Sequence, residues 1–484
     1  MDHPERNKKR GVRMKQFLSL LLAVAMLLSL LPAGLAEGSE EEMDPVDAAV
    51  IAQIEDEGLL NQAAMFRQVI PGPLTLKQSF NFAAYAGFVL PDFVREWSLG
   101  GPDRDYASLP ELMTFADGSP VTRDPEALAK RRAEMLQLLQ DNMYGPVPTE
   151  GYTAEFTLLE EGTALEGKVN RKQVQITVAT EKGSLPVNLL LYTPASVEKA
   201  PIFLCLTSGN YAVLDDPAIL ADASQNAEDT SWEEKRGSST ASYQLTKGLE
   251  RGYGYAFISV NDVAPDNLEG YASKLISLFD EPEMMAISAW VFGLSRAIDY
   301  LVTDPAVDAD RIGVYGHSRY GKAALWAGAN DERIAVAFSH QSGGGGAALN
   351  RQNNADNIHA LTKMEPWWFN SVYASYADNP DGLPVDAHFT IACVAPRAIY
   401  MSNGLYDMWS DPQGSLNALL LARPMYEAYG AEIIPAEYQV GTAEPEADQV
   451  VWTSGMSMHV LPEFHTSSEA DWDNFFNYRD QYQK

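Results

Sequence analysis

The fold of this chain is decided by Arg311-Ile-Gly-Val-Tyr-Gly-His-Ser-Arg-Tyr-Gly-Lys-Ala-Ala-Leu-Trp326. A β-type run ends at Tyr315, Gly316 permits a sharp turn, and a helical pattern begins within four residues of Ser318. A serine placed between a strand and a helix in this way projects its hydroxyl at the carboxyl edge of a sheet. The helix amino end and the amide of Arg319 then point to where an oxyanion would form. The alternative is an ordinary turn serine, but this context favours a nucleophile.

Apolar β-type runs alternate with helical patterns on both sides of this segment. Such alternation, over about 300 residues, predicts an α/β fold with a doubly wound, mostly parallel sheet covered by helices on both faces. We expect strands at residues 174–180, 187–192, 201–206, 255–260, 312–315, 334–338, 397–401 and 458–461, and helices at 124–143, 284–302, 322–329, 415–429 and 468–482.

Composition excludes several classes of function. The 484 residues include 35 Lys and Arg against 66 Asp and Glu, for a formal net charge of −31. Nucleic acid is therefore excluded as a partner, because binding it requires an excess of cations. Two cysteines, Cys205 and Cys393, are too few for a disulfide scaffold or a Cys-rich zinc module, and their apolar surroundings predict buried thiols.

The first residues have the order of a secretory signal. A basic segment at 5–16 precedes fifteen uncharged residues at 17–31, and small residues follow at Gly34 and Ala36. The apolar run is short for a membrane span, so a retained anchor is the less favoured alternative. We expect a signal peptide at 1–36, no stable membrane anchor, and a secreted protein, extracellular or periplasmic. Residues 37–104 are expected to form an acidic linker and N-terminal extension.

A nucleophilic serine needs a base and an acid that orients the base. His465 lies between the last expected strand and the final helix, where this fold class places its base. The rival is His459, but it lies within a strand. For the acid, Asp407 is the first carboxylate after the penultimate strand, and Asp411-Pro412 is more typical of a helix start.

Residues from about 105 to 484 resemble glucuronoyl esterases of the bacterial type, a carbohydrate esterase family that acts on plant cell walls. The resemblance centres on Gly316-His-Ser-Arg-Tyr-Gly-Lys322, in which Tyr320 occupies the position of the second glycine in the common Gly-x-Ser-x-Gly turn, and the glycine follows at 321. The other matching segments are Gly209-Asn210, Asp262–Asp266, Ala289–Arg296, Ala324–Ala329, Asp331–Arg333 and Ser342–Leu349.

The resemblance implies an α/β-hydrolase that needs no metal or cofactor. Its substrates would be esters that join 4-O-methyl-glucuronate on glucuronoxylan to lignin alcohols, as polymer or as lignin–carbohydrate fragments. Ser318 would be the nucleophile and His465 the base, and the backbone and side chain of Arg319 would stabilise the oxyanion.

The resemblance also implies a substrate-binding set. Lys322 and Trp409 would contact the glucuronate ring, and Asp356 would stand where family members carry a sugar-binding glutamate. Many members carry the acid at the position of Gln341, whereas others use an aspartate that matches Asp407, so Asp407 is the expected acid here. From the residues alone, Lys322 could instead neutralise a neighbouring carboxylate, and Trp409 could belong to the core.

The sequence therefore predicts a secreted serine esterase with a Ser-His-Asp triad, a carboxylic ester hydrolase of the 4-O-methyl-glucuronoyl methylesterase type. One alternative is another carbohydrate-directed serine esterase on the same fold, for acetyl or other uronate esters. A second is a catalytically silent carbohydrate-binding protein, suggested by Gln341 and Asp356.

Overall fold

The computed structural model describes residues 106–225, 230–351 and 356–482, with residues 50, 53, 54, 59, 83, 90, 91 and 94. The expected signal peptide at 1–36 and nearly all of the expected extension at 37–104 lie outside the described residues. No helix in the described part is both long enough and apolar enough to cross a bilayer.

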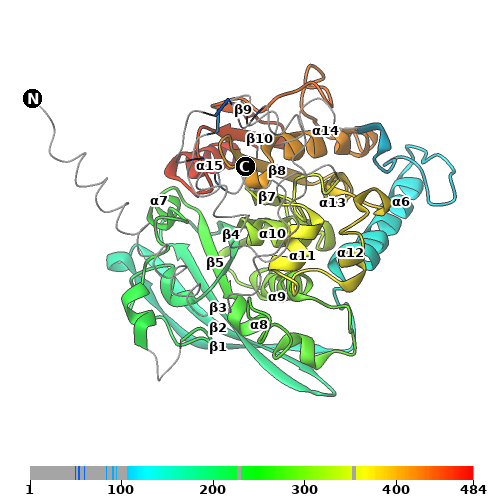
Figure 1. Cartoon of the computed structure of the whole chain (residues 1–484). Helices are drawn as coiled ribbons and strands as arrows, with labels where there is room; N and C mark the ends of the chain where they lie inside the picture. Colours follow the sequence, from blue (N-terminus) through cyan, green and yellow to red (C-terminus); the bar gives the residue numbers. More distant parts are fainter. Residues whose placement is uncertain are drawn as a thin grey trace, which may run out of the picture.

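One sheet organises the described part of the chain (Figure 1). Its strand order is β1-β2-β3-β5-β4-β6-β7-β8-β10-β9. The strands from β5 to β10 along this order run parallel, while β1, β2, β3 and β9 pair antiparallel with their neighbours. The strands are β1 Thr153–Ala164, β2 Val169–Thr180, β3 Gly183–Pro194, β4 Ala200–Thr207, β5 Gly254–Ser259, β6 Val307–His317, β7 Val336–His340, β8 Ala398–Gly404, β9 Gln449–Val451 and β10 Met456–Leu461.

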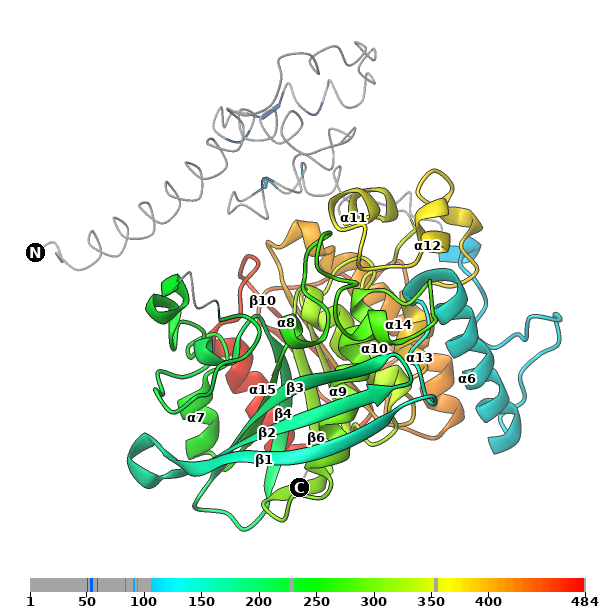
Figure 2. The same ribbon diagram turned by 90° about the horizontal axis from the view of Figure 1, so that it is seen from below.

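Helices cover both faces of this sheet, so the predicted α/β-hydrolase architecture is confirmed. In Figure 2, α6, α13 and α14 lie to one side of the strands and α7 to the other. The helices are α6 Pro125–Leu139, α7 Leu245–Glu250, α8 Val260–Val263, α9 Ala286–Leu301, α10 Arg319–Asn330, α11 Ile358–Met364, α12 Ser371–Ser375, α13 Ala387–Ala392, α14 Pro412–Ala428 and α15 Glu469–Tyr482.

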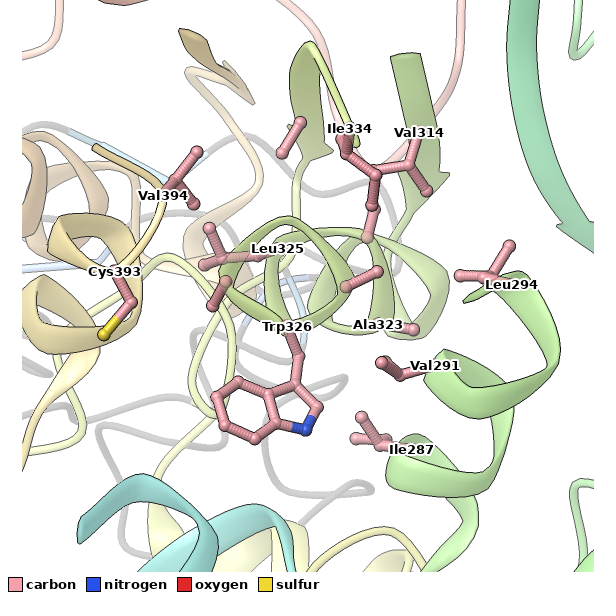
Figure 3. Packing of buried hydrophobic residues seen from close by; sticks show 14 of the residues in the cluster. Ile287, Val291, Leu294, Val314, Ala323, Leu325, Trp326, Ile334, Cys393 and Val394 are labelled. Carbon is pink, nitrogen blue, oxygen red and sulfur yellow. The ribbon is translucent and has the colours of Figure 1, made fainter. Parts of the chain in front are cut away.

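Successive residues of the central strands pack into two separate hydrophobic cores, one on each face of the sheet. On β4, Ile202 and Leu204 join the core under α9, α10 and α13, while Phe203 and Cys205 join the core under α7 and α15. This follows from the two-residue period of a strand, because successive side chains point to opposite faces. In the first core Trp326 of α10 packs near Ile287 and Val291 of α9 (Figure 3). The helix that follows Ser318 is thereby fixed against the sheet.

All of the expected strands and long helices are present, with shifts of a few residues at their ends. Strand β7, for example, starts at Val336 instead of Ile334. The sequence did not predict β1, which lies at the sheet edge and leaves Phe156, Leu158 and Leu159 exposed. Both cysteines are buried free thiols, as expected. The strand ends that matter for the site are those of β6, β7, β8 and β10, which lie side by side and in parallel.

Candidate active site

Ser318 lies at the turn between β6 and α10. Its φ of 59° and ψ of −126° fall in a backbone region that non-glycine residues rarely adopt, and its N–H donates to the carbonyl of His340 on the neighbouring strand at 2.9 Å. A Cβ on Gly316 would lie 1.9 Å from the carbonyl oxygen of Tyr320, so only glycine fits there. A Cβ on Gly321 would lie 2.9 Å from the carbonyl oxygens of Gly316 and His340, which explains why glycine is needed at this displaced position.

His465 and Asp407 form a hydrogen-bonded pair. His465 comes from the loop between β10 and α15, and Asp407 follows β8; the His465 Nδ1 lies 2.7 Å from the Asp407 Oδ2. Asp407 is fully buried and also accepts from the Ser410 N–H at 3.4 Å. Because the carboxylate accepts, His465 Nδ1 carries the hydrogen, which leaves the basic lone pair of the neutral ring on Nε2.

One pocket of about 730 Å³ joins the elbow, which is the turn between β6 and α10 that carries Ser318, to the pair of His465 and Asp407. Ser318, Arg319 and His465 all line it. At the start of α10 the amides of Gly321 and Lys322 donate to the Ser318 carbonyl. Those of Arg319 and Tyr320 precede any intrahelical acceptor and, with the helix dipole, favour negative charge at this point. The remaining wall is rich in hydroxyl and amide side chains: Thr207, Ser208, Ser239, Ser242, Tyr243, Asn261, Asn267, Thr466 and Ser467.

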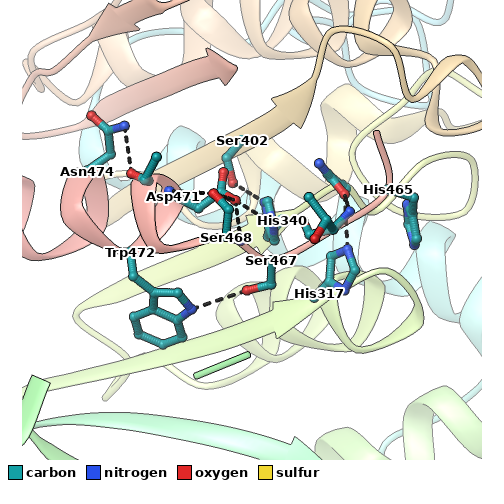
Figure 4. Close-up of polar contacts among 12 residues, drawn as sticks. His317, His340, Ser402, His465, Ser467, Ser468, Asp471, Trp472 and Asn474 are labelled. Atoms are coloured by element: carbon teal, nitrogen blue, oxygen red, sulfur yellow. Dashed lines mark hydrogen bonds and ion pairs between the residues drawn. The ribbon is translucent and has the colours of Figure 1, made fainter. Parts of the chain in front are cut away.

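His459, the alternative candidate for the base, is buried and does not line the pocket. His459 is fully buried, with Nε2 2.8 Å from Asp471 Oδ1 and Nδ1 2.9 Å from the Tyr400 hydroxyl. His340 is equally buried and bonds Ser402 and the Thr466 carbonyl through its two nitrogens (Figure 4).

His317 immediately precedes Ser318, and the sequence-based assignment gave it no role in the site. Its ring lies 4.5 Å from the ring of His465, centroid to centroid, and it lines the pocket (Figure 4). Burial, reinforced by the neighbouring His465 and His340, lowers the pKa of His317 well below its ordinary value. His317 is therefore a neutral ring under the His465 imidazole.

Arg319 is anchored by a residue to which the sequence assigned no role. Asp266 accepts from the Arg319 guanidinium at 2.6 Å and from the indole N–H groups of Trp367 and Trp368 at 2.9 and 2.8 Å. The Arg319 guanidinium carbon also lies 4.9 Å from the centre of the Trp368 ring. The signal available in the sequence was the Asp262–Asp266 segment, which follows β5 at the same sheet edge.

The expected substrate-binding residues lie together but do not line this pocket within the described residues. Lys322 is 3% exposed; its ammonium donates to the carbonyls of Ser342 and Gly344 and lies 2.8 Å from Asp356 Oδ2. Burial lowers the pKa of Lys322 and raises that of Asp356, and each effect is partly offset by the partner's charge. Trp409 is 8% exposed, and its carbonyl accepts from the Asp356 N–H at 3.3 Å. The lysine is thus the neutralising partner of a buried carboxylate.

Gln341 is 1% exposed, and its amide contacts the loop that carries His465. Asp411, the alternative acid, caps α14 by accepting from the Gly414 N–H at 2.8 Å, as its Asp-Pro pair indicated. No group of three or more His, Cys, Asp or Glu side chains among the described residues is arranged to hold a metal ion.

Comparison with known proteins gives consistent relatives. A family model described as glucuronyl esterase of fungi matches residues 244–430. The carbohydrate esterase MZ0003, from an unknown prokaryotic organism, is 33% identical over 392 residues, which are 78% of this chain and 89% of that protein. A 4-O-methyl-glucuronoyl methylesterase of Schizophyllum commune is 28% identical over 345 residues, 69% of this chain and 77% of that one.

Solved structures agree with the sequence relatives. A glucuronoyl esterase from Solibacter usitatus superimposes with a TM-score of 0.70 at 33% identity, covering 77% of this chain and 97% of that chain. A promiscuous CE15 esterase from a marine bacterial metagenome gives a TM-score of 0.70 at 34% identity, covering 77% of this chain and 96% of that chain.

Proposed function

This chain belongs to the glucuronoyl esterase family and is a carboxylic ester hydrolase, and we propose that it is a secreted serine esterase of 4-O-methyl-glucuronate esters on glucuronoxylan, as in lignin–carbohydrate linkages. We assign the catalytic domain to residues 105–484, preceded by a signal peptide at 1–36 and an acidic extension at 37–104. One observation supports the proposal most: a strained elbow serine shares a pocket with a histidine that is hydrogen-bonded to a buried carboxylate.

In the proposed mechanism Ser318 Oγ attacks the ester carbonyl carbon while His465 Nε2 takes the hydroxyl proton. Asp407 keeps the hydrogen on Nδ1 and stabilises the imidazolium that forms. The tetrahedral oxyanion accepts from the backbone N–H of Arg319, and its charge is balanced by the guanidinium. Collapse breaks the bond to the alcohol, which leaves with the proton from His465.

Water then completes the reaction. His465 removes a proton from a water molecule as its oxygen attacks the acyl-enzyme carbonyl, and collapse returns that proton to Ser318 Oγ and releases the uronic acid. We assign Lys322, Asp356 and Trp409 to the layer behind the pocket wall that supports the glucuronate ring, where the ion pair of Lys322 with Asp356 holds that layer in place. Gln341 adjoins Ser342, whose carbonyl holds Lys322, and its side-chain amide bonds the loop that carries His465.

The test is hydrolysis of the methyl ester of glucuronic acid by the Ser318→Ala variant. We expect turnover to fall by about 10⁶-fold, as when the nucleophile of another serine hydrolase is removed, with the thermal unfolding midpoint nearly unchanged. A fluorophosphonate should label the wild type and leave the variant unlabelled. Ser277→Ala, a change at an exposed serine outside the pocket, is the matched control. Retained turnover in Ser318→Ala would refute the mechanism.

Substrate class is tested separately with a panel of esters. Methyl glucuronate, methyl galacturonate and acetylated xylan are compared by kcat/KM. We expect glucuronate to be preferred, and a preference for acetylated xylan would assign the chain to another esterase activity on this scaffold.

A further inference from the structure

We propose that Gln341 is a positioning residue whose side-chain amide grips the backbone on both sides of His465 and so fixes the proposed base beside Ser318. The inference rests on the proposed role of His465.

The grip consists of two hydrogen bonds of opposite sense. Gln341 Nε2 donates to the Phe464 carbonyl at 3.1 Å, and Gln341 Oε1 accepts from the Thr466 N–H at 2.9 Å. The two peptide groups that flank His465 are therefore both held by one side chain. These two hydrogen bonds also assign Oε1 and Nε2 of the Gln341 amide, because a carbonyl oxygen can only accept and a backbone N–H can only donate. A carboxylate at this position would supply no donor for the Phe464 carbonyl.

The neighbouring residue adds a third bond to the same loop. His340 Nε2 donates to the Thr466 carbonyl at 2.8 Å. His340 and Gln341 follow one another where β7 ends, next to β6, which leads to Ser318. The base-bearing loop is thus tied to the strand that adjoins the strand of the nucleophile.

The local backbone is shaped for this contact. Gln341 has a φ of 45°, a left-handed conformation that costs a non-glycine residue about 1–3 kcal/mol, and its N–H donates to the Ser402 carbonyl at 2.8 Å. On the other side, a Cβ on Gly404 would lie 2.7 Å from Gln341 Nε2 and 2.8 Å from the Phe464 oxygen. A glycine at the end of β8 therefore leaves the space in which the amide meets the loop.

The same amide oxygen orders the ring beneath His465. Gln341 Oε1 lies 3.0 Å from His317 Nε2, and because an amide oxygen only accepts, Nε2 carries the hydrogen. The imidazole of His317, neutral because of its lowered pKa, then presents its face to His465 at 4.5 Å. Gln341 thereby constrains the base through its backbone and through its ring neighbour.

A second glutamine makes the same grip far from the site and supplies a matched control. Gln173 on β2 donates from Nε2 to the Ala218 carbonyl and to Glu160 Oε2, both at 2.8 Å, and accepts at Oε1 from the Leu220 N–H at 2.6 Å, so it also spans one residue of a loop. It is 5% exposed, and three strands separate β2 from β6. The loop held by Gln341 carries the proposed base, His465, whereas the loop held by Gln173 carries Ile219.

The experiment compares Gln341→Met with Gln173→Met, using the methyl ester of glucuronic acid and the thermal unfolding midpoint. Both variants should lower the midpoint to a similar degree. Gln341→Met should lower kcat roughly 10- to 100-fold with KM little changed, because a displacement of about 1 Å costs that much in rate, whereas Gln173→Met should keep the wild-type kcat. Wild-type kcat in Gln341→Met, or an equal fall in both variants, would overturn the proposal.

A second variant keeps the test valid if Gln341→Met does not fold. Gln341→Glu keeps the size and the acceptor and removes the donor, so we expect a similar fall in kcat. In the Asp407→Asn background, Gln341→Glu should not restore turnover. Recovered turnover would show that position 341 can hold the acid that orients His465, and would overturn the proposal that Gln341 acts by holding the backbone. Turnover that survives His465→Ala would instead refute the proposed function, so the two failures are distinguishable.

Discussion

Among the described residues, two histidine–aspartate pairs have nearly equal lengths and lie close together along the chain. His465 Nδ1 lies 2.7 Å from Asp407 Oδ2, and His459 Nε2 lies 2.8 Å from Asp471 Oδ1. Both aspartates are buried. The contact between the two side chains therefore does not by itself distinguish a pair suited to catalysis from one suited to structure.

The two pairs differ in which imidazole nitrogen is hydrogen-bonded to the aspartate and in what the second nitrogen of the ring contacts. Asp407 takes Nδ1 of His465, so the basic lone pair is on Nε2 of a ring that lines the pocket with Ser318. Asp471 takes Nε2 of His459, and Nδ1 of the same ring lies 2.9 Å from the Tyr400 hydroxyl, which accepts from the Trp452 indole at 2.8 Å. In one pair the basic nitrogen is available for chemistry, and in the other it is used by the core.

The largest expected effect separates the pairs by rate. Asp407→Asn should lower kcat about 10⁴-fold on the methyl ester of glucuronic acid, because the amide no longer holds the required tautomer of His465. The same change at Asp471 should lower kcat far less, measured per folded molecule. Equal losses of kcat in the two variants would abolish the distinction between the pairs.

The second prediction separates them by stability. Burial by itself would raise the pKa of Asp471, but the charge of His340 and the hydrogen bond from His459 hold that pKa well below its ordinary value. Asp471→Ala should therefore cost about 3–5 kcal/mol in the free energy of unfolding, because buried donors lose their acceptor. Tyr400→Phe, which removes a single hydroxyl from the same pair, should cost about 1 kcal/mol. Denaturant unfolding measures both, and a larger loss in Tyr400→Phe would contradict the reading.

The third prediction extends the comparison to a buried histidine whose ring donates to a carbonyl. His388 Nε2 bonds the Pro110 carbonyl at 2.9 Å, and burial lowers the pKa of His388 from 6.5 to about 4. Because the unfolded chain takes up this proton first, the stability that a neutral His388 contributes is complete above about pH 6.5 and is lost as the pH falls to 4.

Wild type should therefore lose about 3 kcal/mol more than His388→Gln between pH 6.5 and 4. The free energy of unfolding at both pH values measures this difference. Parallel pH profiles for the two proteins would show that His388 does not resist protonation.

The sequence carries the parts of this site that depend on local order. The run to Tyr315, Gly316 and the helix after Ser318 lie within a few residues of one another, so the elbow was predictable. His465 and Asp407 followed from the chain order of strands, since parallel strands bring their carboxyl ends to one edge. Strand β1 was missed because it lies at an edge with much of its apolar surface exposed, which removes the alternation on which such predictions depend.

The parts that could not be predicted depend on contacts between distant segments. Lys322 and Asp356 meet behind the elbow, and nothing in the residues around either one indicates the two carbonyls that also hold the lysine. The same is true of Asp266, which joins Arg319 to two indoles from a third segment. The sequence indicated that Lys322 and Arg319 could matter for the site, but it did not indicate which distant residue each of them contacts.

The place of β10 in the sheet has a consequence for synthesis. This strand comes almost last in the chain, yet it lies between β8 and β9, and the loop after it carries His465. A nascent chain therefore displays Ser318 and Asp407 long before it can assemble the proposed base beside them. A nascent chain that has not yet reached β10 would have an uncovered edge on β8 and would lack the proposed base, so the proposed triad cannot assemble until the last strand of the described sheet has been made.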